Sequence, residues 1–393
     1  MYGNVDAALK YFKVYSKYLK EEMKMNQSET DPCIFFKKDN NNLTELIAAI
    51  YVDDTMLVGT KDKIQWFKDN ISKRFNYSDL GKLKKHLGIW YEWGEDEHSK
   101  YIKGRMPKLI KEVIQKTEET LNKELNRERN TPASPGKTLK KAEEEDESIN
   151  SEEYRSIVGK LMYLTQKIYV EGANSTRELA KHFIKPSNEH WKALEHAVGY
   201  LKQNKEEICI TYRPPRDMRI LHTADSGFGT ESENRKSITG MEGTLGGTII
   251  SWCSQTQETV TLSSTEAEYV ALSTTCKDVV YTQNLLREIL YIKVPGIVLE
   301  DNTGAIYLVR NKQVGNRTKH IEIRHHWIRS LEDSGQAKIM FVKSAENAAD
   351  IHTKNVDAET LRKHRERIRS GLTYSWLNWK QITMEADDKG GST

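Results

Sequence analysis

The sequence lacks several features that would place it at once in a familiar class of protein. No run of about 18 apolar residues occurs, so a membrane-spanning helix is not expected. The first 20 residues lack the uninterrupted apolar stretch of a secretory signal peptide. The four cysteines are scattered without metal-ligand spacing, which favours buried thiols in a reducing, intracellular setting. A net charge of +3 excludes a strongly basic nucleic-acid-binding tail but leaves room for local basic faces.

The chain is long enough for several domains, and changes in composition indicate where they end. Its 393 residues, 37% hydrophobic and 30% charged, suffice for two or three domains of ordinary size. The run Thr131-Pro-Ala-Ser-Pro-Gly136 and the acids that follow at 143–147 predict a linker. Helical periodicity then gives way to short β-prone runs between glycines. The expected segments are a domain at 1–130, a linker at 131–150, a helical connection region at 151–205, an α/β domain at 215–357 and a disordered tail at 370–393.

An acid pair lies between two short apolar runs near the N-terminus. Residues 46–52 and 56–58 are β-prone, and Asp53 and Asp54 separate them, which predicts a tight hairpin. Adjacent carboxylates raise each other's pKa and are costly at such a turn unless they bind a cation. The alternative is an ordinary Asp-Asp turn, which would be the commoner outcome for an isolated pair.

Four further acids follow predicted strand ends or helix starts in the C-terminal part. They are Asp225, Glu268, Asp301 and Asp350. An α/β fold can bring distant carboxylates together at such positions. Carboxylates that meet at one point repel each other unless a divalent cation such as Mg²⁺ or Mn²⁺ neutralises them. Any one of these acids taken alone would be read as a solvated surface group.

Several segments, in order along the chain, resemble the Pol polyproteins of copia-type retrotransposons. Residues 51–54 (YVDD) are similar to the YxDD box of reverse transcriptases, and residues 262–269 (LSSTEAEY) to a signature of the family's ribonuclease H domain. The likeness covers residues 2 to about 357. The other segments that carry it are 79–88 (DLGKLKKHLG), 154–164 (YRSIVGKLMYL), 190–193 (HWKA), 200–202 (YLK), 235–240 (RKSITG), 318–321 (TKHI) and 349–351 (ADI).

The resemblance implies a multidomain protein of α/β and α+β class. A partial reverse transcriptase palm, thumb and connection would precede a ribonuclease H-like α/β domain with a mixed sheet. It implies two bound Mg²⁺ or Mn²⁺ ions. Glu266 is a rival to Glu268, but residues two apart point to different faces of a helix, and the family uses the second acid. The catalytic, metal-binding carboxylates implied are Asp225, Glu268, Asp301 and Asp350, with Asp53 and Asp54 as metal ligands of a polymerase remnant.

The resemblance also implies partners and a limit. The substrate would be the RNA strand of an RNA:DNA hybrid, read by shape and 2′-hydroxyls; an intact element would add an upstream polyprotein, and no membrane partner is expected. Residues 1–4 resemble a family segment between the third palm aspartate and the YxDD box, so we expect that aspartate, the fingers and polymerase activity to be absent. A basic helix at 319–332 would face phosphates or solvent.

The alternatives are an inactive retroelement remnant that at most binds nucleic acid, and an integrase-like metal nuclease. The complete set of four acids disfavours the first, and the upstream YxDD segment disfavours the second.

Overall fold

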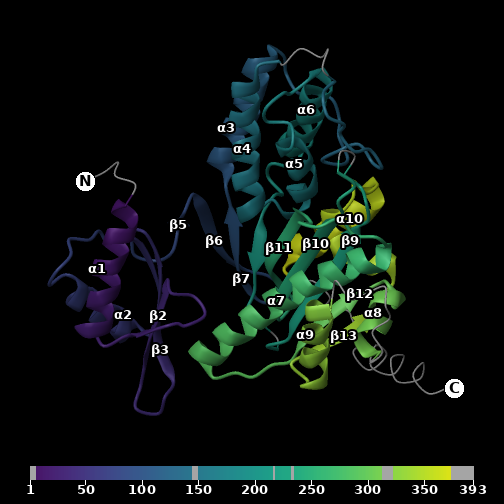
Figure 1. The fold of residues 1–393 in the computed structure, drawn as a ribbon. Coiled ribbons are helices and arrows are strands. Elements are labelled where there is room, and N and C mark those ends of the chain that lie inside the picture. The colour runs from purple at the N-terminus through teal and green to yellow at the C-terminus, as the bar shows by residue number, and fades with distance from the viewer. Residues whose placement is uncertain (1–5, 144–148, 216, 232–233, 312–321, 373–393) are drawn as a thin grey trace. The chain divides into compact units, whose positions relative to one another are not determined.

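The computed structural model describes residues 6–143, 149–215, 217–231, 234–311 and 322–372. Residues 1–4, 144–148 and 318–321 of the predictions above, and the tail beyond 372, lie outside this range. The chain forms two compact units, one of residues 1–87 with 280–293 and one of residues 88–279 with 294–393 (Figure 1). In the part of the chain that is described, no helix combines the length and the apolar character needed to cross a bilayer.

The first unit is an antiparallel sheet of order β1-β2-β3-β4 with two helices that share its core. Burial alternates along β3, as expected for a strand with one face against a core. That core includes Leu19 of α1, Leu46 of β3 and Phe67 of α2. The elements are α1 (Ala7–Glu21), β1 (Asn26–Gln27), β2 (Ile34–Lys38), β3 (Thr44–Tyr51), β4 (Asp54–Gly59) and α2 (Lys61–Ile71), followed by β5 (Lys85–His86).

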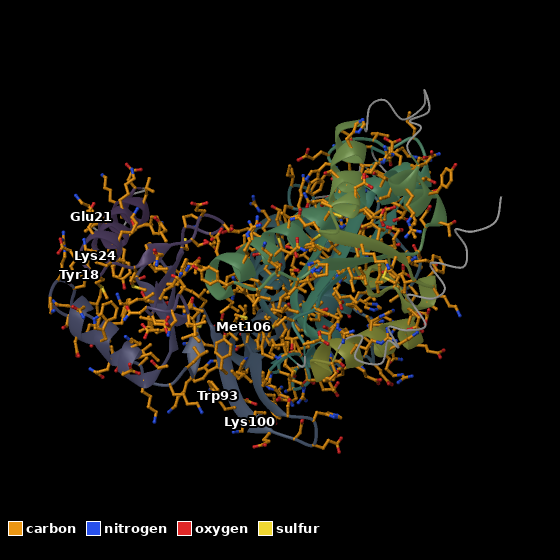
Figure 2. The ribbon with its side chains drawn as sticks, turned by 90° about the horizontal axis from the view of Figure 1, so that it is seen from below. Tyr18, Glu21, Lys24, Trp93, Lys100 and Met106 are labelled. Carbon is orange, nitrogen blue, oxygen red and sulfur yellow. The ribbon has the colours of Figure 1, made fainter. Side chains whose placement is uncertain are left out.

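The second unit opens with a hairpin and a helical bundle. Trp93 on β6 and Lys100 on β7 mark the hairpin in Figure 2, together with Met106, the buried residue before α3. In the bundle the buried Tyr154 donates its hydroxyl to the Leu179 carbonyl at 3.0 Å and packs edge-on against Trp191, with ring centroids 5.4 Å apart. Two of the segments that carry the family resemblance are therefore packing motifs. The elements are β6 (Ile89–Glu95), β7 (Lys100–Arg105), α3 (Pro107–Leu121), α4 (Ser151–Lys167), η1 (Val170–Gly172), α5 (Ala173–Ala180), α6 (Asn188–Gln203) and β8 (Ile210–Tyr212).

A five-stranded mixed sheet of order β11-β10-β9-β12-β13 completes this unit. β9, β10 and β11 are antiparallel, whereas β12 runs parallel to both β9 and β13. The multidomain α/β class and the mixed sheet predicted from the sequence are thus confirmed. The elements are β9 (Ile220–Gly227), β10 (Ile238–Leu245), β11 (Thr248–Thr256), α7 (Ser264–Leu290), β12 (Gly296–Glu300), α8 (Thr303–Arg310), α9 (Glu322–Asp333), β13 (Ala337–Phe341), η3 (Ser344–Glu346), η4 (Ala348–His352) and α10 (Ala358–Ser370).

The start of the expected linker lies against the second unit. The Gly136 amide donates to the Asn355 carbonyl at 2.9 Å, and His190 Nε2 lies 2.8 Å from the Lys140 carbonyl. The bundle also touches the sheet, because Trp252 of β11 donates its indole N–H to the Thr165 carbonyl at 2.7 Å. The domain boundary at 131–150 stays a prediction.

Candidate metal centre

Carboxylates from four elements meet at the ends of the two parallel strands β9 and β12. Thr223 of β9 is paired with Leu299 of β12, so two residues further along each strand Asp225 and Asp301 come side by side. Asp225, Asp301 and Asp350 each offer an oxygen within 4.8 Å of the others. Asp301 forms a second such group with Glu268 and Glu300. The structure therefore brings the four predicted acids to one place, with Asp301 common to both groups.

The two acids at the start of α7, Glu266 and Glu268, have different surroundings. The Glu266 amide donates to Ser263 Oγ at 3.2 Å, and Glu266 Oε2 accepts from the Leu262 amide at 2.8 Å. This is the reciprocal pattern of a capping box, except that the second bond reaches Leu262 instead of the residue that caps the helix. Glu266 is thus engaged at the helix start and belongs to neither acid group, whereas Glu268 joins the cluster.

Two residues without charge bring Asp350 to the sheet. Asn347 is buried, and it donates to the Ala224 carbonyl at 2.8 Å while its side-chain oxygen accepts from the Ala349 amide at 3.2 Å. Gly240, directly opposite Asp225 on β10, allows η4 to lie close to the sheet. A Cβ atom at that position would lie 2.7 Å from the Ala349 carbonyl oxygen and 2.6 Å from Thr353 Cγ2. The backbone approach therefore requires glycine here.

Burial and mutual repulsion both favour the protonated forms of these acids. Burial, and after it the charge of Asp350, raises the pKa of Asp225 to about 7. Burial, and after it the charge of Asp225, raises the pKa of Glu268 to about 9. Burial also raises the pKa of Asp350. Burial, joined by the charge of Glu268, raises the pKa of Glu300 well above its usual range.

The chain supplies some compensation for this negative charge. The Thr353 hydroxyl donates a hydrogen bond to Asp225 Oδ2. Lys354 Nζ lies 2.9 Å from Asp350 Oδ1, and the lysine side chain of this ion pair is about half exposed. Burial opposes the charge of Lys354, but the carboxylates of Asp225 and Asp350 outweigh it and raise the pKa of the lysine. One ammonium group cannot neutralise five acids.

The donor set fits a divalent cation of the Mg²⁺ or Mn²⁺ type. All ligand atoms are carboxylate oxygens, which these hard cations prefer. Among the described residues, Glu268 Oε2 and Glu300 Oε2 are buried without a hydrogen-bond partner. A buried carboxylate oxygen in that state needs either a proton or a cation.

Sequence reasoning did not single out three of the residues found here. Glu300 was detectable as a charged residue that ends the apolar run 297–299, directly before Asp301. Thr353 and Lys354 follow Asp350 by three and four residues. Their contribution depends on how η4 folds back onto β9, which spacing in the sequence does not reveal.

The other predicted acids, Asp53 and Asp54, lie in the first unit. The predicted hairpin is present, since Tyr51 pairs with Asp54 across a two-residue turn. Val52 in this turn has a φ of 55°, a region that disfavours branched side chains. Both acids are exposed, and within the described residues neither belongs to a group of three potential metal ligands. Their role as ligands of a polymerase remnant stays a prediction.

Comparison with known proteins gives one family match and several relatives. A family described as "Reverse transcriptase (RNA-dependent DNA polymerase)" matches residues 1–128. The Retrovirus-related Pol polyprotein from transposon TNT 1-94 of Nicotiana tabacum is 31% identical over 363 residues, which are 91% of this chain and 26% of that protein. The Pol polyprotein from transposon RE1 of Arabidopsis thaliana is 27% identical over 329 residues, 83% of this chain and 22% of that protein. The chain thus spans about a quarter of the length of these relatives.

A solved structure shows a weaker likeness. LC11-RNase H1, crystallised in complex with an RNA/DNA hybrid, matches with a TM-score of 0.28 and 16% identity over 37% of this chain and 98% of its own. The same protein, isolated from compost by a metagenomic approach, matches in a second structure with a TM-score of 0.27. At these TM-scores the likeness adds nothing to the strand order and the acid cluster described above.

Proposed function

The chain belongs to the copia-type retrotransposon Pol polyproteins as a reverse transcriptase and ribonuclease H fragment, and from this premise we propose that it hydrolyses the RNA strand of RNA:DNA hybrids with two divalent ions. The observation that carries the proposal is the position of Asp301, which belongs to two groups of three carboxylates. A shared ligand between two neighbouring cations is the arrangement that two-ion phosphodiester cleavage uses.

The residues of the centre have distinct parts in this proposal. Asp225, Asp301 and Asp350 would hold one ion, and Glu268 with Asp301 would hold the other. When bound, Mg²⁺ or Mn²⁺ supplies an activated water and stabilises charge on the leaving oxygen. The hydroxyl of Thr353 orients Asp225, and the ammonium of Lys354 orients Asp350. Phosphates and 2′-hydroxyls of the hybrid are the groups by which it would be bound.

The test uses the whole 393-residue chain and a hybrid whose RNA strand is labelled. Cleavage is expected with Mg²⁺ or Mn²⁺ and is expected to stop with a chelator. Asp225→Asn and Glu268→Gln keep shape but remove charge, so each should lower the cleavage rate by about 100-fold or more while hybrid binding stays. Glu266→Gln is the matched control, because its side chain lies at the helix start outside the acid groups, and it should keep most of the activity.

Two results would count against the proposal. A folded chain that binds hybrid but cuts it with neither ion would favour the inactive retroelement remnant. If Glu266→Gln abolishes cleavage and Glu268→Gln does not, the choice between the two acids of α7 is wrong.

A further inference from the structure

Glu300 is a buried carboxylate that the proposed reaction leaves without a role. It is the last residue of β12 and is 0% exposed. The residues before it are apolar, and of these Gly296, Val298 and Leu299 are buried. An isolated carboxylate in such surroundings is costly unless it carries a proton or meets a cation.

The direction of Glu300 follows from the geometry of β12. Gly296 faces α7, since a Cβ atom there would lie 2.1 Å from Cγ1 of Val279. Side chains two residues apart share a face of a strand, so Val298 and Glu300 face α7 as well. Glu300 therefore lies under the start of that helix, where Glu268 is found.

Glu300 and Glu268 meet there with free oxygens. Glu300 Oε1 accepts from the Asn302 amide at 3.0 Å, whereas its Oε2 has no hydrogen-bond partner. Glu268 Oε2 is buried and equally without a partner. One oxygen each of Glu268, Glu300 and Asp301 lies within 4.8 Å of the other two. If the two glutamates shared a proton, a short hydrogen bond would join their oxygens. Neither Oε2 atom makes a hydrogen bond, so a shared proton does not account for this pair.

We propose that Glu300 is a fifth carboxylate of the centre, which holds the second divalent ion together with Glu268 and Asp301. The inference rests on the proposed function and names a ligand that the four predicted acids do not include. The ion would lie on the α7 side of Asp301, and the group of Asp225 and Asp350 would hold the first. Glu300→Gln should then weaken the binding of one ion only.

The experiment measures binding of Mn²⁺ to the full chain by electron paramagnetic resonance, which reports free Mn²⁺ without any need for activity. The wild-type chain should bind two ions. Glu300→Gln should leave the affinity for one Mn²⁺ ion unchanged and lower the affinity for the other by about tenfold or more. Loss of a residue that only hydrogen-bonds a metal ligand already lowers metal affinity by about that factor. The matched control is Glu242→Gln on β10, because Glu242 is equally buried (1% exposed), has neither oxygen in a hydrogen bond and lies in neither acid group. Its charged neighbour is His352, whose Nε2 lies 3.8 Å from Glu242 Oε2. It should bind both ions like the wild type.

Melting in a chelator checks folding. Glu300→Gln should melt no lower than the wild type, because glutamine keeps the shape of the side chain and brings no charge into the buried site. Should it fail to fold, Glu300→Asp decides in the same way, since it withdraws the carboxylate by one carbon–carbon bond. Unchanged Mn²⁺ binding in a folded variant overturns the role of Glu300, even if hybrid is cleaved. Loss of one ion in a chain that never cuts hybrid supports Glu300 and rejects only the proposed function. A wild-type chain that binds no Mn²⁺ overturns both.

Discussion

The pKa of Asp225 shows how strongly burial and neighbouring carboxylates disfavour the ionised form in this centre. Its carboxyl is 3% exposed and faces Asp350, and its pKa is raised from 3.8 to about 7. The native state thus binds this proton more tightly than the unfolded chain does. Stability from this group is fully present below about pH 4 and is lost as the pH rises through about 7.

We therefore expect the chelator-treated protein to lose stability between about pH 5 and about pH 8 relative to Asp225→Asn, whose amide does not titrate. The difference in the free energy of unfolding between the two proteins should change by on the order of 2 kcal/mol over this pH range. Urea denaturation at a series of pH values measures it. Parallel stability curves for the two proteins would show that Asp225 is not protonated in the native metal-free state. Added Mn²⁺ should restore stability most at the alkaline end, because an ion competes with protons for these oxygens.

At the level of the elements, the close approach of η4 to the sheet depends on Gly240. Gly240→Ala places a methyl group against the Ala349 carbonyl and the Thr353 side chain, so the backbone has to shift. We expect a loss of roughly 1–3 kcal/mol in the free energy of unfolding, together with weaker Mn²⁺ binding as Asp350 moves from the sheet. Urea denaturation and the Mn²⁺ titration measure the two effects.

The control for this change is Gly159→Ala in α4, where a Cβ atom would meet nothing within 4 Å. Alanine there should stabilise the protein by about 0.5–1 kcal/mol, since glycine is a poor residue in a helix interior. A Gly240→Ala protein as stable as this control, with wild-type Mn²⁺ binding, would contradict the close-approach argument.

The elements also show what the sequence can and cannot predict. The hairpin around Asp53 was predictable because two β-prone runs flank a polar pair, and the mixed sheet because the segments resemble a known family. The strand end at Asp301 was predictable as well, since the apolar run 297–299 stops just before it. The strand end predicted at Asp225 is wrong by two residues, because β9 continues to Gly227. The roles of Asn347, Gly240 and Glu300 were not, because each depends on which distant element it meets. No local pattern specifies that η4 lies on β9 or that Glu300 faces α7.

At the level of the whole molecule, contacts between distant segments define the two compact units. Residues 88–130 belong to the same unit as the mixed sheet, and β7 pairs with β8 beyond the bundle. The Pro- and Gly-containing run at 131–136 lies in this unit too, and the Gly136 amide donates to the Asn355 carbonyl at 2.9 Å. Composition reports local flexibility, whereas unit boundaries depend on pairings between distant strands.

The first unit leads to a prediction about polymerisation. The 393-residue chain should not extend a primer on an RNA template, because the described residues bring no third carboxylate to Asp53 and Asp54. Two-ion chemistry would lack a shared ligand there. Primer extension with Mg²⁺ and with Mn²⁺ measures this. Templated incorporation above a no-enzyme control that disappears in Asp53→Asn would show the prediction to be wrong.

The wide spacing of the acids along the chain has a consequence for folding kinetics. Asp225 and Asp350 are about 125 residues apart, and Glu268 and Asp301 come from two further elements between them. Contacts between residues so far apart in the sequence form only when the chain between them has lost conformational entropy by closing a long loop. Repulsion among the carboxylates requires β9, β12 and the start of α7 to meet, and η4 adds Asp350 to it. We therefore expect the repulsion to arise after local helices and the hairpin of β10 and β11 have formed. We expect a penalty that arises so late to leave the folding rate almost unchanged and to speed unfolding of the finished domain.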